Sequence, residues 1–323
     1  MAGESAEETS LESFNPRSLS VVVPTYNEEA NAVPLVRGLV AVLQGMKLPF
    51  ELIVVDDGSR DSTVAQLRSL LSTTPELVIL RLRRNFGQTS ALQAGFDRAR
   101  GEVVVTLDGD LQNDPRDIPR LLERLKLGAD VVSGWRVDRK DGLWLRRVPS
   151  QLANGLIRRL TGVPIHDQGC SLKAYRREVI QRLRLYSDMH RFIGVLVMPT
   201  GAAIDEIAVA HHPRVAGVSK YGLSRIFKVI ADLLTIQMLT RFRENPMRWF
   251  ALFGAPFLIG AIASGLVAVW EWGGTLVLAT VSLTLATTCV SCLLAGLFGE
   301  TIVSNSGRVS NRRMLFREWG GRR

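Results

Sequence analysis

Short apolar runs rich in β-branched residues recur along the first half of the chain, with longer amphipathic stretches between them. The runs cover residues 19–23, 50–55, 77–82, 102–107 and 129–133, and their length and composition predict buried strands. The stretches between them, residues 28–46, 62–71, 89–100 and 117–127, follow helical periodicity. Four strand-to-helix repeats predict an α/β fold with a Rossmann-like, mostly parallel sheet, whose ligands bind beyond the carboxyl ends of the strands.

Beyond residue 133 this alternation loosens into a basic stretch. Its positive residues are Arg136, Arg139, Lys140, Arg146 and Arg147. A helix is expected near residues 151–160, followed by strands near residues 171–175 and 204–210. This part of the chain is expected to build the second side of a binding site.

Two long apolar runs, residues 249–270 and 272–298, contain no charged residue. Each is as long as the roughly 20 residues that cross a bilayer as a helix. Arginines flank the pair on both outer sides, which predicts that both ends lie in the cytoplasm and that the loop between the spans faces out. Two buried core helices are the alternative, and the length and near contiguity of the runs argue against it.

The remaining segments complete a division into five parts. Residues 1–17 are acidic and contain no apolar run long enough for a signal peptide, so a disordered tail is expected before a cytosolic domain over residues 18–222. Residues 223–245 carry an apolar stripe at helical spacing, which predicts an amphipathic interfacial helix, although a helix packed on the domain has the same periodicity. The two spans are assigned to residues 246–300 and a basic cytoplasmic tail to residues 301–323.

The chain is basic, with 40 Lys and Arg against 31 Asp and Glu and a formal net charge of +9. Such a balance suits contact with anionic lipid, phosphate or nucleic acid. No aromatic stacking platform or helix-turn-helix pattern accompanies the charge, so nucleic-acid binding is not favoured. Cys289 and Cys292 lie one turn apart in an apolar run and are interpreted as packing residues. His166, His211 and His212 show no metal-ligand spacing and are expected to pack or to lie at the surface.

The fourth expected strand ends in two carboxylates, Asp108 and Asp110, separated by Gly109. Aspartates are common in turns for purely local reasons. At the mouth of a parallel sheet, however, both side chains can reach one ion. Mg²⁺ and Mn²⁺ prefer such oxygen ligands together with substrate phosphates, and they neutralise charge on a departing diphosphate. The pair therefore predicts a divalent-metal site.

The first two expected strands end in polar corners of the same kind. Residues 24–29 read Pro-Thr-Tyr-Asn-Glu-Glu, and residues 55–59 read Val-Asp-Asp-Gly-Ser. Helix caps and a glycine turn would explain each corner taken alone. Three polar corners in one sheet instead favour a shared pocket, with Tyr26 available to stack or hydrogen-bond and Asp57 to accept a hydrogen bond from a base.

Six ordered motifs carry a family resemblance over about residues 18–240. They are residues 24–29, 55–59, 84–88 (Arg-Asn-Phe-Gly-Gln), 108–112 (Asp-Gly-Asp-Leu-Gln), 167–170 (Asp-Gln-Gly-Cys) and 217–221 (Gly-Val-Ser-Lys-Tyr). The sequence resembles the family 2 glycosyltransferases of the GT-A fold. Within them it is most similar to the polyprenyl-phosphate sugar synthases, the group that includes dolichol-phosphate mannose synthase and bacterial undecaprenyl-phosphate glycosyltransferases. The family usually has alanine where Gly109 stands.

The resemblance implies a role for each matching residue. Those implied to bind the nucleotide-sugar donor are Pro24, Tyr26, Glu28, Asp56, Asp57, Gly58 and Asp108. Those implied to hold Mg²⁺ or Mn²⁺ are Asp108, Asp110 and Gln112, and the first two with Asp167 are the implied catalytic residues. Those implied to hold the phosphate of a lipid acceptor are Arg136, Arg146, Arg147, Ser150, Ser219 and Lys220. Asp167 is left open between a base, an orienting group and a structural loop carboxylate.

The implied reaction is transfer of a sugar from the nucleotide-sugar to a polyprenyl phosphate at the cytoplasmic face of a membrane, in bacteria the inner membrane. A phosphate acceptor is already anionic, so it needs little deprotonation, and direct attack would invert the anomeric carbon. A processive polysaccharide synthase is disfavoured because two spans are too few for a polymer channel. An inactive nucleotide-binding scaffold is disfavoured by the intact carboxylates. The sugar and any homo-oligomer formation stay open.

Overall fold

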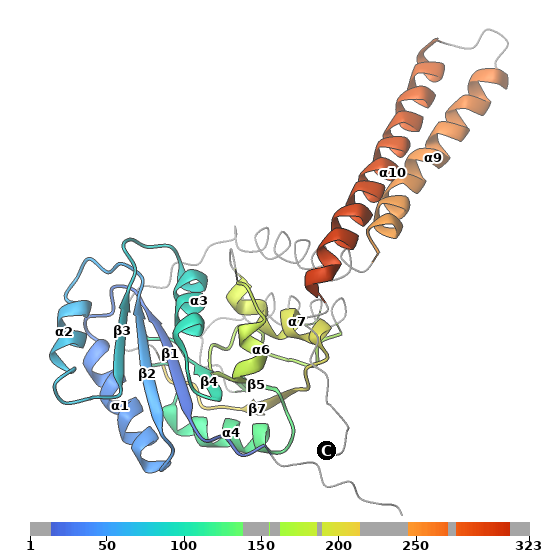
Figure 1. Ribbon diagram of the computed structural model, residues 1–323. Coiled ribbons are helices and arrows are strands. Elements are labelled where there is room, and N and C mark those ends of the chain that lie inside the picture. Colours follow the sequence, from blue (N-terminus) through green and yellow to red (C-terminus); the bar gives the residue numbers. More distant parts are fainter. Residues whose placement is uncertain are drawn as a thin grey trace, which may run out of the picture. The chain divides into compact units, whose positions relative to one another are not determined.

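In the computed structural model, residues 14–137, 155, 162–185, 189–213, 245–270 and 276–310 are described. The chain divides into two units, residues 1–232 with 315–323 and residues 233–314. The first unit contains a seven-stranded sheet with the order β3-β2-β1-β4-β6-β5-β7 (Figure 1). Its strands are β1 Leu19–Thr25, β2 Phe50–Asp56, β3 Leu77–Arg81, β4 Val103–Thr106, β5 Val131–Trp135, β6 Lys173–Arg176 and β7 Ile204–Ala208.

Helices cover both faces of this sheet. Those of the first unit are α1 Ala32–Gly45, α2 Thr63–Ser69, α3 Gln88–Arg98, α4 Ile118–Lys126, α6 Arg177–Gln181 and α7 Ile193–Val197, with short 3₁₀ turns at Pro115–Asp117, Met189–Phe192 and Met198–Thr200. Buried leucines of α1 and α4 pack with one face of β1, β2 and β4. Residues of α3, α6 and α7 pack with the other face. The mostly parallel α/β sheet expected from the sequence is confirmed.

One strand of the sheet runs against the others. β6 is antiparallel to both β4 and β5, whereas β1 pairs in parallel with β2 and β4, β2 with β3, and β5 with β7. The register sets Lys173 of β6 opposite Thr106 of β4 and Ser133 of β5. The segment that leads into β6 therefore lies at the same edge as the carboxyl ends of β4 and β5. This edge brings the later motifs beside the earlier ones.

The first helix begins four residues after the expected position. Asn27 has φ +55°, in the left-handed region, so it cannot continue a right-handed helix. The carbonyl of Glu28 then accepts hydrogen bonds from the amides of Asn31 and Ala32, both at 2.9 Å, and closes a turn before α1. Residues 28–31 therefore form part of the corner and not part of the helix. This is a correction to the sequence-based bounds.

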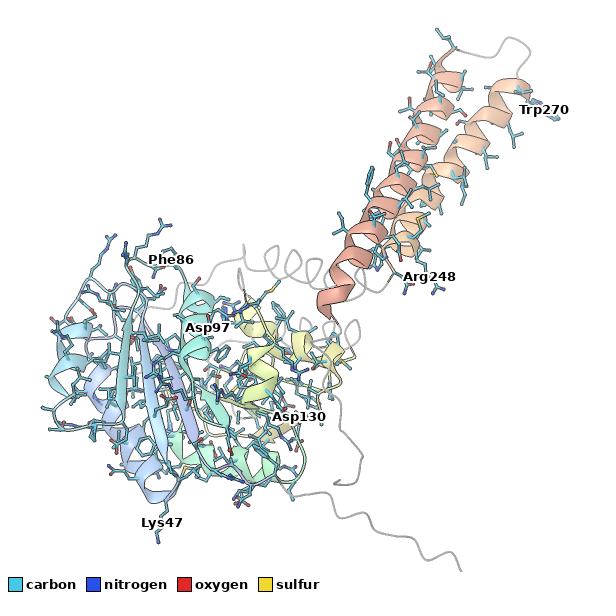
Figure 2. The ribbon with its side chains drawn as sticks, viewed as in Figure 1. Lys47, Phe86, Asp97, Asp130, Arg248 and Trp270 are labelled. Atoms are coloured by element: carbon cyan, nitrogen blue, oxygen red, sulfur yellow. The ribbon has the colours of Figure 1, made fainter. Side chains whose placement is uncertain are left out.

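The second unit contains two long helices, α9 Pro246–Trp270 and α10 Leu276–Ser310. Their apolar segments have mean hydropathies of 2.1 and 2.0, and only 11% and 6% of those segments are buried. Both are long and apolar enough to cross a membrane. Figure 2 shows the apolar side chains along both helices, including Trp270 at the end of α9. Because so little of this surface is covered by protein, the helices do not resemble buried core helices of a soluble domain.

Small residues bring α9 and α10 close together. A Cβ atom on Gly254 would lie 3.4 Å from Cβ of Cys292 and 3.5 Å from Sγ of Cys289. Further along α9 from Gly254, the carbonyl of Ala261 accepts a 2.8 Å hydrogen bond from the hydroxyl of Ser282 on α10. Glycine contacts of this kind are typical of helix pairs in membranes. The interpretation of Cys289 and Cys292 as packing residues agrees with these contacts.

Predicted elements near residues 151–160 and over residues 223–245 lie outside the described part of the chain, apart from Gly155 and Asn245.

Candidate active site

The corners after β1 and β2 are joined into one unit by hydrogen bonds. The amide of Asn27 donates to Oγ of Ser59 at 2.8 Å, and Oδ1 of Asn27 accepts from the amide of Arg60 at 2.9 Å. The amide of Glu28 donates to Oγ1 of Thr63 at 2.9 Å. The two corners thus form one rigid polar surface at the carboxyl edge of the sheet.

Three residues expected to bind the donor lie on this surface. Pro24 is buried near the end of β1, opposite Val55 of β2. Tyr26 is 39% exposed, so its ring is accessible to a planar ligand. The Glu28 carboxylate accepts a 2.6 Å hydrogen bond from Nδ2 of Asn31, a residue that is itself buried. Glu28 therefore also stabilises the entry into α1.

The carboxylate of Asp57 holds the loop that follows β3. Its Oδ1 accepts from the amide of Phe86 at 2.7 Å, and its Oδ2 accepts from the amide of Gly87 at 2.9 Å. Asp57 is 3% exposed, so both bonds are protected from water. Figure 2 shows Phe86 at one end of the domain, opposite Lys47, which precedes β2. Asp57 fixes a loop that carries Arg83 and Arg84, and its contact with a base stays a prediction.

Gly58 lets the same loop approach closely. Its φ is +73°, and a Cβ atom there would lie 2.5 Å from the carbonyl carbon of Arg84. Both the backbone conformation and the space exclude a side chain. The neighbouring Asp56 is fully buried, accepts from the amide of Ser59 at 3.1 Å and lies 3.7 Å from Nε of Arg81. Asp56 therefore stabilises the corner that carries Asp57 and Gly58.

The corner after β4 places two carboxylates together in low-dielectric surroundings. Burial and the negative charge of Asp110 raise the pKa of Asp108. Oδ1 of Asp108 accepts a 2.7 Å hydrogen bond from Nε2 of Gln88, at the start of α3. Asp110 is 8% exposed, and its Oδ1 accepts from the amide of Gln112 at 3.2 Å. Burial and mutual repulsion both oppose ionisation of this carboxylate pair. A bound cation would offset the repulsion between Asp108 and Asp110.

The glycine between these carboxylates fits tightly. A Cβ atom on Gly109 would lie 2.9 Å from Cγ2 of Thr25 and 3.2 Å from the carbonyl oxygen of Pro24. The corners after β1 and β4 are therefore in direct contact. Alanine at this position would require Thr25 to move.

The donor set fits a hard divalent cation that is completed by substrate. Asp108, Asp110 and Gln112 offer carboxylate and amide oxygens at one corner, as Mg²⁺ and Mn²⁺ prefer. Within the described residues, no three His, Cys, Asp or Glu side chains form a metal cluster.

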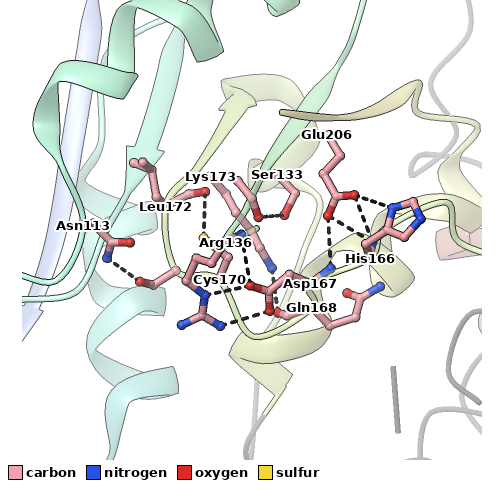
Figure 3. Close-up of polar contacts among 12 residues, drawn as sticks. Asn113, Ser133, Arg136, His166, Asp167, Gln168, Cys170, Leu172, Lys173 and Glu206 are labelled. Atoms are coloured by element: carbon pink, nitrogen blue, oxygen red, sulfur yellow. Dashed lines mark hydrogen bonds and ion pairs between the residues drawn. The ribbon is translucent and has the colours of Figure 1, made fainter. Parts of the chain in front are cut away.

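Arg136 and Asp167, expected on the acceptor and catalytic sides respectively, form a buried bidentate ion pair. Nε of Arg136 lies 2.7 Å from Oδ2 of Asp167, and Nη2 lies 3.0 Å from Oδ1 (Figure 3). Their side chains are 12% and 7% exposed. Burial alone would lower the pKa of Arg136, but the hydrogen bonds and charge of Asp167 raise it above its usual value. The guanidinium is permanently charged and fixed in orientation.

Comparison with protein families identifies the fold and the chemistry of this arrangement. Residues 20–184 match the model of "Glycosyl transferase family 2". The chain belongs to glycosyl transferase family 2. The match covers the corners after β1, β2 and β4 and the Arg136–Asp167 pair.

Two curated family 2 relatives are similar over most of the chain. A dodecaprenyl-phosphate galacturonate synthase of Rhizobium johnstonii is 48% identical over 249 residues, covering 76% of this chain and 73% of the relative. An undecaprenyl-phosphate 4-deoxy-4-formamido-L-arabinose transferase of Pseudomonas aeruginosa is 38% identical over 292 residues, covering 87% and 84%. Both are named as synthases or transferases, and this family 2 chain is a glycosyltransferase.

Solved structures support the GT-A fold. Glucosyl-3-phosphoglycerate synthase from Mycobacterium tuberculosis, crystallised with Mn²⁺, uridine diphosphate and phosphoglyceric acid, is 25% identical with a TM-score of 0.52. The match covers 68% of this chain and 78% of that one. The GT-A fold expected from the sequence is confirmed, with its mixed, mostly parallel sheet.

Most of the expected acceptor residues fall outside the described part of the chain. They are Arg146, Arg147, Ser150, Ser219 and Lys220. Arg136 is the member of that set whose surroundings the structure describes. Its role toward an acceptor stays a prediction.

The structure shows contacts around the site of this glycosyltransferase that the sequence did not predict. Gln88 belongs to the 84–88 motif, and its bond to Asp108 joins that motif to the β4 corner. His211 and His212 lie beside the segment that follows Asp110, where the amide of His212 donates to the carbonyl of Gln112 at 2.8 Å and Asn113 pairs with His211. No local sequence signal indicates these contacts, because Gln88 and Asp108 lie 20 residues apart and Gln112 and His212 lie 100 residues apart along the chain.

Proposed function

We propose that this glycosyltransferase transfers a sugar from a nucleotide-sugar to a polyprenyl phosphate. The observation that carries the proposal is the 48% identity, over three quarters of both chains, to an enzyme named for forming a dodecaprenyl-phosphate sugar. The second relative is named for an undecaprenyl-phosphate acceptor. A preformed buried arginine and a pair of apolar helices are the features that such an acceptor requires.

The donor side of the proposal consists of the three joined corners. Pro24, Tyr26 and the loop fixed by Asp57 would receive the nucleotide. Asp108, Asp110 and Gln112 would hold Mg²⁺ or Mn²⁺. When bound, the metal supplies positive charge that offsets the charge developing on the departing nucleoside diphosphate. The solved fold neighbours crystallised with Mn²⁺ or Mg²⁺ and uridine diphosphate support this cofactor.

On the acceptor side, Arg136 would orient the lipid phosphate for attack on the anomeric carbon. A phosphate oxygen is anionic at neutral pH, so its nucleophilicity does not depend on a general base. Both carboxylate oxygens of Asp167 are already bonded to the guanidinium, which favours an orienting role for Asp167 over a role as base. Direct displacement opposite the leaving diphosphate would invert the anomeric configuration.

The membrane arrangement is part of the same proposal. α9 and α10 would cross the bilayer within residues 246–300, with residues 1–17, the domain over residues 18–222 and residues 301–323 on the cytoplasmic side. Residues 223–245 would lie at the interface. An acceptor whose chain stays in the bilayer can be reached only by an enzyme held at the surface.

A donor screen tests the function and identifies the sugar. The purified chain in lipid nanodiscs would receive polyprenyl phosphate, Mg²⁺ and one nucleotide-sugar at a time. Donors would include galacturonic acid and 4-deoxy-4-formamido-L-arabinose, for which the two relatives are named, with glucose, mannose and N-acetylglucosamine as comparisons. We expect lipid-dependent release of nucleoside diphosphate and a glycosyl-phospholipid of matching mass. Turnover that is independent of the lipid phosphate with every donor would contradict the proposal.

A further inference from the structure

A single carboxylate on β7 holds the turn that carries Asp167. Oε1 and Oε2 of Glu206 each accept from the amide of His166 at 3.0 Å, and Oε1 also accepts from the amide of Asp167 at 3.1 Å. Oε2 lies 2.8 Å from Nδ1 of the His166 ring (Figure 3). The Glu206 side chain is 8% exposed. Bonds from consecutive amides to one shielded carboxylate leave the turn little freedom.

The same turn is held on its other side by a buried cation. Nζ of Lys173, on β6, donates to the carbonyl of Gln168 at 3.2 Å, and Lys173 is 2% exposed. Glu206 therefore holds the amides of the turn, and Lys173 holds a carbonyl. Burying two charges costs free energy that apolar residues would not cost. Their placement is better explained by a need for exact geometry in the turn than by a need for stability.

The turn carries the Asp167 carboxylate, and this carboxylate orients Arg136. Asp167 grips both Nε and Nη2 of the guanidinium, and the charge of Arg136 in turn acts on Asp108. Trp135, the residue before Arg136, stacks on the His166 ring with centroids 4.8 Å apart. Two consecutive residues of the β5 end thus contact two consecutive residues of the turn. A shift of the turn would therefore move Arg136.

We propose that Glu206 is a positioning residue for the acceptor site, acting on the lipid phosphate through Asp167 and Arg136. The inference rests on the proposed role of Arg136 in holding that phosphate. In this proposal Glu206 acts only through the turn and contacts neither substrate. Its loss should therefore raise the KM for the polyprenyl phosphate and leave the binding of nucleoside diphosphate unchanged.

The test compares two substitutions at Glu206 with a matched control. Glu206→Ala removes every bond to the turn and is expected to raise the KM for polyprenyl phosphate about tenfold, the scale of one charge-assisted hydrogen bond. Glu206→Gln keeps an acceptor oxygen for the two amides, so it should stay within about threefold of the unmodified chain. Glu123 is exposed on α4 and lines a surface groove together with Glu206, so Glu123→Gln removes a charge nearby and should change nothing.

A double-mutant cycle shows whether Glu206 acts through Arg136. Arg136→Lys keeps the charge but loses the bidentate fork, and it should itself raise the KM for the lipid phosphate. In that background Glu206→Ala should add less than twofold, because the geometry it protects is already lost. Multiplicative effects of the two substitutions would overturn the proposal. So would an equal loss of nucleoside diphosphate affinity in calorimetry, or an unaltered KM in Glu206→Ala.

Two further outcomes keep the result decisive. If Glu206→Ala does not fold, Glu206→Asp replaces it, since the shorter side chain keeps the charge but cannot reach both amides. Glu206→Asp should then raise the KM more than Glu206→Gln does, and the opposite order would overturn the proposal. Lipid-dependent turnover by the unmodified chain establishes the proposed function separately, so a failure of the positioning role is distinguishable from a failure of that function.

Discussion

Asp57 offers a direct test of how the proposed donor site is built. Its two oxygens accept from the amides of Phe86 and Gly87 at 2.7 and 2.9 Å, and the side chain is 3% exposed. In Asp57→Asn, one oxygen remains an acceptor and the other becomes an amide nitrogen. That nitrogen would face a backbone N–H, so one loop amide would lose its partner.

The magnitude follows from the bond that is lost. A hydrogen bond to a charged group contributes about 1.5–3 kcal/mol, and about 2 kcal/mol corresponds to roughly 30-fold faster opening of the loop. Hydrogen exchange of the Phe86 and Gly87 amides should therefore accelerate by about that factor without nucleotide. Calorimetry should show weaker binding of nucleoside diphosphate, while the dependence of turnover on lipid concentration stays near that of the unmodified chain.

The control and the refuting result are both specific. Asp97→Asn changes an aspartate on the outer surface of α3 that is 56% exposed, and it should alter neither exchange nor binding. If Asp57→Asn weakened nucleotide binding with no change in exchange at Phe86 and Gly87, Asp57 would act by direct contact alone. The loop-holding role derived from the structure would then be refuted.

Four other predictions follow from the site and the helices. Asp110→Asn should abolish turnover in saturating Mg²⁺ or Mn²⁺ while circular dichroism stays unchanged, and near-normal activity would remove Asp110 from the metal site. Gly58→Ala forces a side chain into the backbone of the loop after β3 and should cost about 1–3 kcal/mol in denaturant unfolding, which an unaltered midpoint would contradict. Burial raises the pKa of the Cys170 thiol to about 11. The stability that comes from this shift is complete below the pKa of the unfolded chain and is lost as the pH rises towards 11. Cys170→Ser should lack this alkaline loss of stability in pH-dependent melting. Cysteines introduced at Ser10 and Arg322 should label equally in sealed inverted vesicles, whereas opposite labelling would mean that only one helix crosses the membrane.

The sequence predicted the polar corners because each corner is a local event. A β-branched strand followed by Asp, Asn or Gly indicates both the end of a strand and the chemistry placed there, as at Asp57 and Asp108. Parallel pairing then brings the corners together without further information. The register Thr25 to Asp56 places the first two side by side, as expected.

The contacts that tune these residues could not be predicted in the same way. Asp57 binds amides 29 and 30 residues further along the chain, and Glu206 binds amides 39 and 40 residues before it. No periodicity connects such partners, because their contact depends on the order of strands in the sheet. The antiparallel direction of β6 was beyond the sequence for the same reason, since an apolar run does not specify its direction.

The proposed donor and acceptor halves of the site are stabilised by different kinds of interaction, and this difference matches the charges of the proposed substrates. The donor corners are joined mainly by backbone amides bonded to neutral or acidic side chains, as at Asn27 and Asp57. The proposed acceptor side is ordered by a chain of charged groups from Glu206 to Arg136. Two anionic substrates repel each other, so the approach of a lipid phosphate to a diphosphate requires a cation whose orientation is fixed. A guanidinium held in a buried bidentate pair meets that requirement better than a flexible surface lysine would, because its orientation is fixed before the substrate arrives.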